Sequence, residues 1–188
     1  MKNIFILGTC RTGKTTFSKI LQKELDNYQI LEVDSIISAL QSTFDNIEIG
    51  FIHDNLKNNK LSEFLSILIE KFQTRLGCEY NFIINSDSIL PEDLIKYFDF
   101  SSIIVYYFVN SKLTVDQMFE NCRNYDNKNQ WTFKRTDEQL RKHLRIAKEF
   151  EIEIINQCKK YNIECIDTSY KRDTLFKNLV NDIKNKLD

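Results

Sequence analysis

The chain has 188 residues, of which 42% are hydrophobic and 28% charged, so it has enough apolar side chains for a folded core and is not a disordered tail. Its 26 basic and 27 acidic residues give a net charge of −1, which argues against broad nucleic-acid binding. One proline and four glycines exclude collagen-like and low-complexity classes, and the length predicts a single domain over residues 1–188.

Short apolar runs alternate with longer amphipathic stretches along the whole chain. The runs predict strands at residues 3–7, 29–33, 81–85, 102–109 and 163–167. The amphipathic stretches predict helices at residues 14–25, 61–76, 114–125, 137–160 and 170–187. Thr114 is a suitable N-cap for the third of these helices. Strands that alternate with helices in this way predict a doubly wound α/β fold with a parallel sheet.

Two segments lack a clear period. Residues 42–60 are polar and aromatic, and residues 126–136 contain Asn, Lys, Asp and Gln with one Trp and one Phe. Segments of this length inside a compact domain are often functional lids or binding loops. The alternative is a tolerated surface insertion.

The sequence has no apolar run near the roughly 20 residues that a membrane-spanning helix needs. The apolar run 4–7 is also too short for a signal peptide, so we expect a cytoplasmic protein with no membrane partner. The five cysteines form no Cys-x-x-Cys pair, and His53 and His143 lie far apart in the sequence. We therefore expect neither structural zinc nor a disulfide framework.

A phosphate-binding motif, Gly-x-x-x-x-Gly-Lys-Thr, follows the first predicted strand and opens the first predicted helix. Its backbone N–H groups and the helix N-terminus can wrap a phosphate. Lys14 can reach the β- and γ-phosphates, and the Thr15 hydroxyl can bind Mg²⁺. The predicted nucleotide-binding residues here are Gly8, Thr9, Cys10, Arg11, Thr12, Gly13, Lys14, Thr15 and Thr16.

Cys10 allows two interpretations. A thiol that faces a helix N-terminus and Lys14 can have a lowered pKa and be sensitive to oxidation. Alternatively, Cys10 is a small residue that fits the loop, and we favour this interpretation.

With this motif and this order of elements, the chain resembles the P-loop small-molecule kinases, the superfamily of adenylate kinase, shikimate kinase and related nucleoside and antibiotic kinases. The resemblance implies a three-layer P-loop NTPase fold with a five-stranded parallel sheet in the order 2-3-1-4-5. It also implies a helical acceptor-binding insertion at about residues 36–77 and a lid at about residues 123–137.

Two other nucleotide-binding classes fit less well. GTPases read guanine with Asn-Lys-x-Asp after a strand, whereas residues 127–130 here lack the Asp and follow a predicted helix. Motor-type ATPases place an acidic residue after an apolar strand to hold Mg²⁺, and this chain has no apolar run that ends in Asp-Glu.

Two carboxylates follow predicted strands and are candidates for the acceptor site. Asp34 follows the second strand, where ligands of open α/β sheets bind. By resemblance, Asp34 accepts the proton of the acceptor hydroxyl or orients the metal's water, although it would also serve as a helix N-cap. Asp87 follows the third strand and is either an acceptor or metal-water ligand or a plain loop residue.

The resemblance also implies arginines in the lid, because a guanidinium can clamp the transferred phosphoryl group. Arg123 lies where the superfamily has an Arg at the start of its lid. Arg135 begins an Arg-Thr-Asp-Glu segment similar to the far edge of an adenylate kinase lid. Arg141 and Arg145 are nearby, and all of these charges could instead be solvated. Trp131 and Phe133 would give the lid an apolar side.

The last predicted strand ends at Asp167, and Thr168 and Ser169 follow it. In related kinases this loop borders the adenine, so the resemblance makes Thr168 and Ser169 candidates for nucleotide binding. The alternative is that they cap the terminal helix.

The composition of the insertion indicates the class of acceptor. From Ser35 to Phe100 there is one arginine, Arg75, whereas a monophosphate acceptor normally requires arginine clamps. The aromatic and acidic residues of this stretch include Phe44, Asp45, Glu48, Phe51, His53 and Asp54. A neutral or cationic molecule with a hydroxyl fits these groups better, with Phe51, His53, Asp34 and Asp87 as candidate contacts.

These observations predict a Mg²⁺-dependent kinase that transfers the γ-phosphoryl group of ATP to a small, non-phosphorylated acceptor. Its catalytic residues would be Lys14, Asp34, Arg123 and Arg135, and its metal ligands Thr15 and Asp34. The alternatives are a nucleoside monophosphate kinase of the adenylate kinase type and a non-catalytic ATP-binding regulatory protein.

Overall fold

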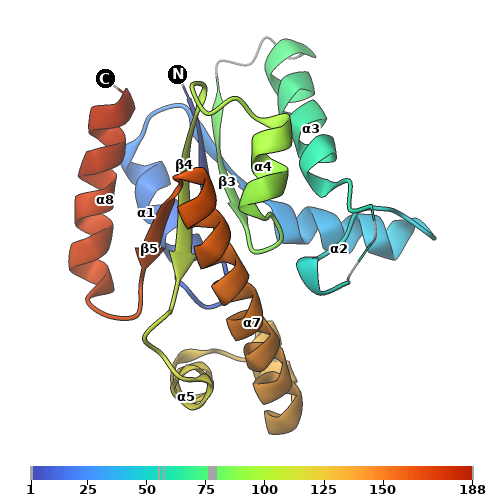
Figure 1. Cartoon of the computed structure of the whole chain (residues 1–188), viewed down its shortest axis with the longest axis vertical. Coiled ribbons are helices and arrows are strands. Elements are labelled where there is room, and N and C mark those ends of the chain that lie inside the picture. The colour runs from blue at the N-terminus through green and yellow to red at the C-terminus, as the bar shows by residue number, and fades with distance from the viewer. Residues whose placement is uncertain (1, 55, 57, 76–79, 188) are drawn as a thin grey trace.

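Five parallel strands form one sheet in the order β2-β3-β1-β4-β5 in the computed structural model of the chain (Figure 1). The structure describes residues 2–54, 56, 58–75 and 80–187. The strands are β1 (Asn3–Gly8), β2 (Tyr28–Glu32), β3 (Asn81–Ser86), β4 (Ile103–Val109) and β5 (Glu164–Asp167). This architecture confirms the predicted fold class and strand order.

Helices connect the strands and cover the sheet. They are α1 (Lys14–Glu24), α2 (Val33–Thr43), α3 (Leu61–Arg75), α4 (Pro91–Tyr97), α5 (Val115–Tyr125), α6 (Trp131–Lys134), α7 (Asp137–Tyr161) and α8 (Arg172–Leu187), with a 3₁₀ turn η1 (Ile52–Asp54). The short helices α4 and α6 carry too few residues to show a period in the sequence. Thr114 caps α5 through a reciprocal pair of hydrogen bonds with Gln117, as its position predicts. Over the described residues, no helix is long and apolar enough to cross a membrane.

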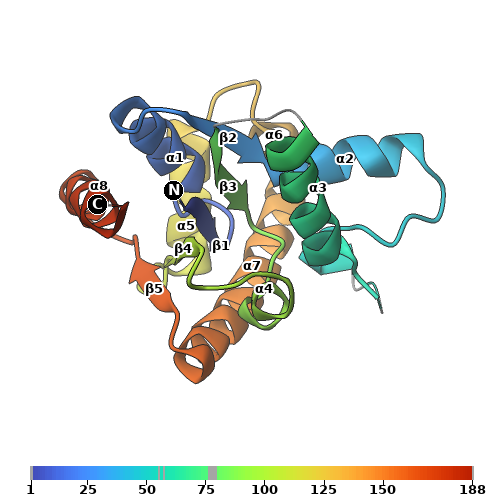
Figure 2. The same ribbon diagram turned by 90° about the horizontal axis from the view of Figure 1, so that it is seen from above.

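Alternate side chains of β1 point to opposite sides of the sheet, and helices cover both sides, so the fold has three layers. Ile4 and Ile6 pack with α1 and α8 on one side of the sheet, whereas Phe5 and Leu7 pack with α2, α3, α4 and α7 on the other. Figure 2 shows α1 and α8 on one side and α3, α4 and α7 on the opposite side. All four side chains are fully buried, and each contributes about 1.5–3 kcal/mol to folding. The sheet is therefore a rigid base for the loops at its carboxyl edge.

Gly8 ends β1 at a point where the chain passes directly against β4. Its φ of +124° is a backbone conformation that glycine adopts readily and that residues with a side chain rarely adopt. A Cβ built there would lie 2.0 Å from the carbonyl oxygen of Phe108. Gly13, with φ of +89°, then caps α1. The two glycines bend residues 9–12 into a loop at the carboxyl ends of the strands.

The predicted lid lies on a second small core. Helices α5 and α7 pack together through Met118, Leu140 and Leu144, and Cys10 of the phosphate loop belongs to the same cluster. The predicted insertion contains α2, η1 and α3. Residues 55, 57, 76 and 77 of that predicted range lie outside the described residues.

Candidate active site

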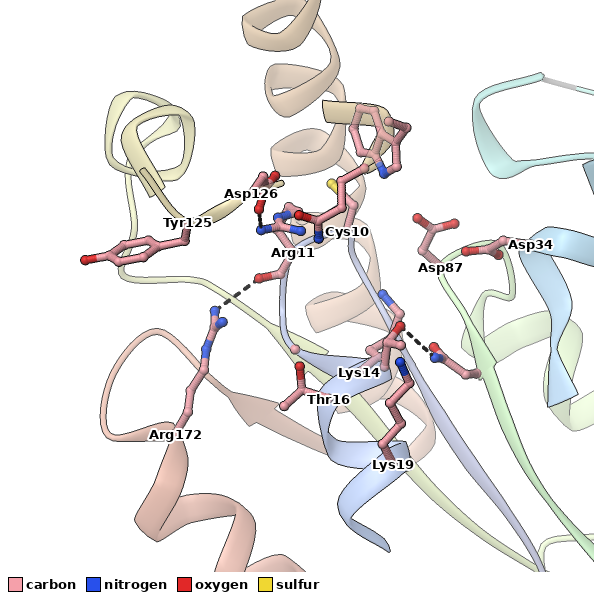
Figure 3. A pocket seen from close by; sticks show the side chains of 15 residues that line it. Cys10, Arg11, Lys14, Thr16, Lys19, Asp34, Asp87, Tyr125, Asp126 and Arg172 are labelled. Carbon is pink, nitrogen blue, oxygen red and sulfur yellow. Dashed lines mark hydrogen bonds and ion pairs between the residues drawn. The ribbon is translucent and has the colours of Figure 1, made fainter. Parts of the chain in front are cut away.

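A cavity of about 470 Å³ lies at the carboxyl edge of the sheet (Figure 3). The phosphate loop, the start of α2, the end of β3 and the lid each contribute to its wall. The lining residues are Cys10, Arg11, Gly13, Lys14, Thr15, Thr16, Lys19, Asp34, Asn85, Asp87, Tyr125, Asp126, Gln130, Trp131 and Arg172. The structure thus brings most of the predicted phosphate-loop residues together with Asp34 and Asp87.

The phosphate loop is closed by hydrogen bonds to one carbonyl. The Nζ of Lys14 donates to the carbonyl oxygen of Thr9 at 2.7 Å, and the hydroxyl of Thr12 donates to the same oxygen at 2.8 Å. The side chain of Lys14 is buried but lines the cavity, so the ammonium group can exchange the carbonyl for a phosphate oxygen.

Thr15 belongs to a polar chain that the sequence interpretation missed. The amide of Asn85 donates to the Thr15 hydroxyl and to Oε1 of Glu32, both at 3.0 Å. Hydroxyl and carboxylate oxygens are the donors that Mg²⁺ prefers, so Thr15 or Asp34, which line the cavity, could hold that ion there, and Glu32 is linked to Thr15 through Asn85. Glu32 stands two residues before Asp34 in the sequence, a spacing that could have indicated its place.

Asp34 lies in the first turn of α2, because β2 ends at Glu32 rather than at residue 33 as predicted. The hydroxyl of Ser86 donates to Oδ1 of Asp34 at 3.2 Å, and the backbone N–H of Asp87 also donates to this carboxylate. Burial, together with the charge of Asp87, raises the pKa of Asp34 to about 7, although Lys14 opposes the shift. Both carboxylates point into the same side of the cavity (Figure 3).

The predicted lid arginines lie elsewhere. Arg123 donates to Asp137 at 2.7 Å and to the carbonyl oxygens of Thr132 and Arg135, so it fastens the ends of the lid together. Arg135 lies over the ring of Trp131. Neither guanidinium lines the cavity in this structure, because neighbouring lid groups bind both of them.

Two other arginines take their place at the cavity. Arg11 forms an ion pair with Asp126, and Arg172 donates to the carbonyl oxygen of Thr168 at 2.7 Å and to that of Arg11 at 3.1 Å. Burial, and next the charge of Arg11, lowers the pKa of Arg172. Arg172 is distant from the motif in sequence, so only the fold reveals its position.

Thr168 ties the last strand to the phosphate loop. Its buried hydroxyl lies 2.8 Å from the carbonyl oxygen of Thr12, and Thr168 lines neither the main cavity nor its neighbour. Ser169 lines the neighbouring cavity of about 320 Å³. The other residues of that cavity are Arg11, Asn110, Leu113, Met118, Asn121, Tyr125 and Arg172.

The predicted acceptor contacts Phe51 and His53 lie in an aromatic ladder. Phe51 stacks on His53, His53 meets His143 at 5.8 Å between ring centroids, and His143 meets Trp131 at 4.5 Å. The ladder connects the insertion to the lid. Beside it, a cavity of about 30 Å³ is lined by Thr9, Cys10, Ile52, His53, Asp87, His143, Ile146, Ala147 and Phe150.

The Cys10 thiol is not activated. Its burial, together with the charge of Asp87, raises its pKa to about 12, despite the opposing effect of Lys14. The structure therefore favours Cys10 as a small residue that fills space beside Leu140 and Leu144.

The fold is similar to that of solved structures that include shikimate kinases. Shikimate kinase from Bacteroides thetaiotaomicron superposes with a TM-score of 0.57 over 99% of this chain and 98% of that one, at 14% identity. Shikimate kinase from Acinetobacter baumannii in complex with shikimate gives 0.52, over 100% and 96%, at 16% identity. The tunicamycin resistance protein of Deinococcus radiodurans gives 0.56, over 97% and 96%, at 14% identity. No family model and no curated protein matches the sequence. The chain therefore has the P-loop small-molecule kinase fold.

Proposed function

We propose that this protein is a Mg²⁺-dependent kinase that transfers the γ-phosphoryl group of ATP to a hydroxyl group of a small, non-phosphorylated molecule. The observation that carries the proposal is that Lys14 and Thr15 line the same cavity as Asp34. A donor site for phosphates thereby faces a carboxylate that can take up a proton, as phosphoryl transfer to a hydroxyl requires.

Asp34 is the proposed base. Its pKa of about 7 lies near the pH at which a base combines a sufficient deprotonated fraction with a useful proton affinity. The hydrogen bonds from Ser86 and from the backbone of Asp87 fix the orientation of its carboxylate. A bound Mg²⁺ would neutralise charge on the phosphates, and the Thr15 hydroxyl would hold it, with the carboxylate of Glu32 linked to Thr15 through Asn85.

The acceptor is proposed to be uncharged or cationic at the end that reaches the insertion. Of the described residues, those that line the small cavity include Asp87, His53 and His143 but neither Lys nor Arg. Burial, and next the charge of Arg135, lowers the pKa of His143, so its imidazole is mainly neutral at pH 7. A monophosphate would bring two negative charges to a wall that the carboxylate of Asp87 also lines. The likeness to the shikimate kinases supports a small-molecule acceptor without identifying it.

The nucleotide base is proposed to lie in the neighbouring cavity of about 320 Å³. Arg11, Tyr125 and Arg172 line both this cavity and the main one, so the two cavities adjoin. Apolar side chains of Leu113 and Met118 offer a surface for a flat ring.

The test is ADP formation from Mg·ATP over a panel of acceptors. The panel contains nucleosides, nucleoside monophosphates, shikimate-like acids, pantothenate-like alcohols and aminoglycosides, with a blank that has no acceptor. We expect one non-phosphorylated class to stimulate ADP formation. Stimulation by monophosphates alone would refute the proposed acceptor class.

Variants separate a kinase from a non-catalytic nucleotide sensor. We expect Asp34→Asn to retain binding of Mg·ATP and to lose acceptor-stimulated turnover by about 10²-fold or more. Asp99→Asn, at an exposed aspartate outside the cavity, is the matched control. Unchanged turnover in Asp34→Asn would exclude Asp34 as the base.

A further inference from the structure

Arg11 and Asp126 form an ion pair where the phosphate loop meets the end of α5 (Figure 3). The side chain of Arg11 is 28% exposed and that of Asp126 is 1% exposed. Both residues line the main cavity, so the pair belongs to its wall. A buried carboxylate needs a charged partner, and Arg11 is the partner that Asp126 has at this cavity.

The lid fixes the position of Asp126. Its backbone N–H donates to the carbonyl oxygen of Cys122 at 3.1 Å, which ends α5. The buried hydroxyl of Thr132 in α6 donates to its other carboxylate oxygen, Oδ2. Asp126 therefore presents one oxygen, Oδ1, to Arg11 from a fixed place on the lid.

The main chain of Arg11 is equally fixed. Its φ of 64° lies in the left-handed region, which is uncommon for a residue with a side chain. Its carbonyl oxygen accepts hydrogen bonds from Arg172 at 3.1 Å and from the amide of Asn110 at 3.2 Å. This conformation is thus held from the β4 and α8 sides, while the guanidinium extends toward the lid.

Arg11 is the guanidinium best placed to accept a further anion. Arg123 is bound to lid groups outside the cavity, and Arg135 does not line the cavity but lies over the ring of Trp131. Arg172 donates to three oxygens of the surrounding loops. A guanidinium has five N–H donors, so Arg11 retains donors beyond its contacts with Asp126 and Cys122. Arg11 and Arg172 are also close enough for their charges to repel, and an anion in the cavity would offset this repulsion.

We propose that Arg11 contacts the transferred γ-phosphoryl group, and that Asp126 acts as a positioning residue that holds its guanidinium for this contact. The inference rests on the proposed kinase function. In the step, the acceptor oxygen forms a bond to the γ-phosphorus and its proton passes to Asp34. The bond from the γ-phosphorus to the β–γ bridging oxygen breaks, and ADP leaves with the electron pair. Arg11 stabilises the charge on the equatorial oxygens during this exchange.

The test compares binding of Mg·ADP with binding of Mg·AMP-PNP, a non-hydrolysable ATP analogue, by isothermal titration calorimetry of the full chain. We expect Arg11→Met to weaken AMP-PNP binding by about tenfold or more while it changes ADP binding little, because one charged hydrogen-bonding group is lost from the γ-phosphate. Arg11→Lys keeps the charge and should lose part of this preference for AMP-PNP. Arg145→Met, at an exposed arginine of α7 that does not line the cavity, is the matched control and should keep the preference in full.

The variant Asp126→Asn distinguishes two roles of Arg11. Arg11 either contacts the γ-phosphoryl group or only joins the phosphate loop to the lid through its ion pair with Asp126. The charge of Arg11 remains in this variant, so we expect the preference for AMP-PNP to persist and acceptor-stimulated turnover to fall. Equal weakening of ADP and AMP-PNP binding in Arg11→Met and Asp126→Asn would overturn the inference, because a loosened lid affects both nucleotides alike. Thermal unfolding confirms that each variant is folded.

Lys14→Met distinguishes failure of this inference from failure of the proposed function. If Lys14→Met loses nucleotide binding while Arg11→Met binds both nucleotides as the wild type does, the role of Arg11 is wrong and the kinase proposal stands. If Lys14→Met binds Mg·ATP as the wild type does, the nucleotide site itself is wrong and both proposals fail.

Discussion

The Nζ of Lys14 lies 2.7 Å from the carbonyl oxygen of Thr9, across the mouth of the phosphate loop. This contact keeps a buried ammonium group hydrogen-bonded when no phosphate is present, and it holds the loop in the shape that a phosphate needs. A nucleotide phosphate that binds here would exchange one oxygen partner of Lys14 for another, with little rearrangement of the main chain.

The first prediction concerns Lys14. We expect Lys14→Met to weaken binding of Mg·ATP by about 10²-fold or more, because a charge-assisted hydrogen bond to phosphate is lost together with the internal bond to Thr9. Calorimetric titration measures the effect. Lys23→Met, at an exposed lysine in the last turn of α1, is the control and should bind as the wild type does. Equal affinities for both variants would refute the assigned phosphate site.

Gly8 gives the second prediction. We expect Gly8→Ala to destabilise the fold by more than about 4 kcal/mol, because the new Cβ would meet the backbone of Phe108 at a positive φ. Gly50→Ala is the control. There a Cβ would meet the side-chain ends of Asp54 and Leu56, which can move, so we expect a cost below about 1.5 kcal/mol. Urea unfolding measures both, and similar costs would contradict the close approach of β1 to β4.

The third prediction is a pH dependence that arises from Asp34. Its folded-state pKa of about 7 lies above its usual value of 3.8, so the folded protein binds the proton more tightly than the unfolded chain. The free energy of unfolding of the ligand-free protein should therefore fall as the pH rises from about 4 to about 7.

Asp34→Asn removes this dependence. We compare the free energy of unfolding of the variant with that of the wild type. We expect the variant's advantage to be about 1–2 kcal/mol larger at pH 8 than at pH 5, after allowance for the partial exposure of the group. Denaturant unfolding at the two pH values measures the gain. Asp99 is exposed, and its pKa is lowered by hydrogen bonds from Ser101, so Asp99→Asn should show no gain at pH 8. A gain for Asp34→Asn that is the same at both pH values would show that Asp34 ionises normally.

The fourth prediction concerns a buried carboxylate of α7 that binds the residue after β4. Glu151 is 2% exposed, accepts the backbone N–H of Asn110 at 2.6 Å and pairs with Lys148. We expect Glu151→Ala to destabilise the fold by about 3 kcal/mol, because a buried donor and a cation lose their partner.

The measurement for Glu151 is again denaturant unfolding. Glu149→Ala, at an exposed glutamate two residues earlier in α7, is the control and should change stability by less than about 0.5 kcal/mol. Since Asn110 also holds the carbonyl of Arg11, Glu151→Ala should weaken nucleotide binding as well. Unaltered stability would show that Glu151 does not fasten this loop.

The sheet and the phosphate loop could be predicted because their signals are local. The apolar strands carry continuous runs, and the motif from Gly8 to Thr15 lies between a strand and a helix. Helix α6 was not predicted, because four residues carry no measurable period. The boundary at Asp34 was misplaced by one residue because Val33 suits a strand as well as the first turn of a helix.

The cations around the site depend on packing between distant segments. Arg172 reaches the phosphate loop only because α8 packs on α1, and no local pattern marks this contact. The resemblance suggested Arg123 and Arg135 as phosphate clamps, but neighbouring groups of the lid bind both side chains. The partner of Arg11 is 115 residues away in the sequence, so its position could be found only from the fold.

The most direct test of the kinase proposal is mass spectrometry of the complete reaction mixture, with Mg·ATP and the acceptor that stimulates ADP formation. We expect one phosphorylated acceptor for each ADP formed by the wild-type protein, with the phosphate on a hydroxyl group. We expect neither product with Lys14→Met. Release of ADP with an equal amount of inorganic phosphate, and no phosphorylated acceptor, would refute the kinase proposal, because the protein would then be an ATPase.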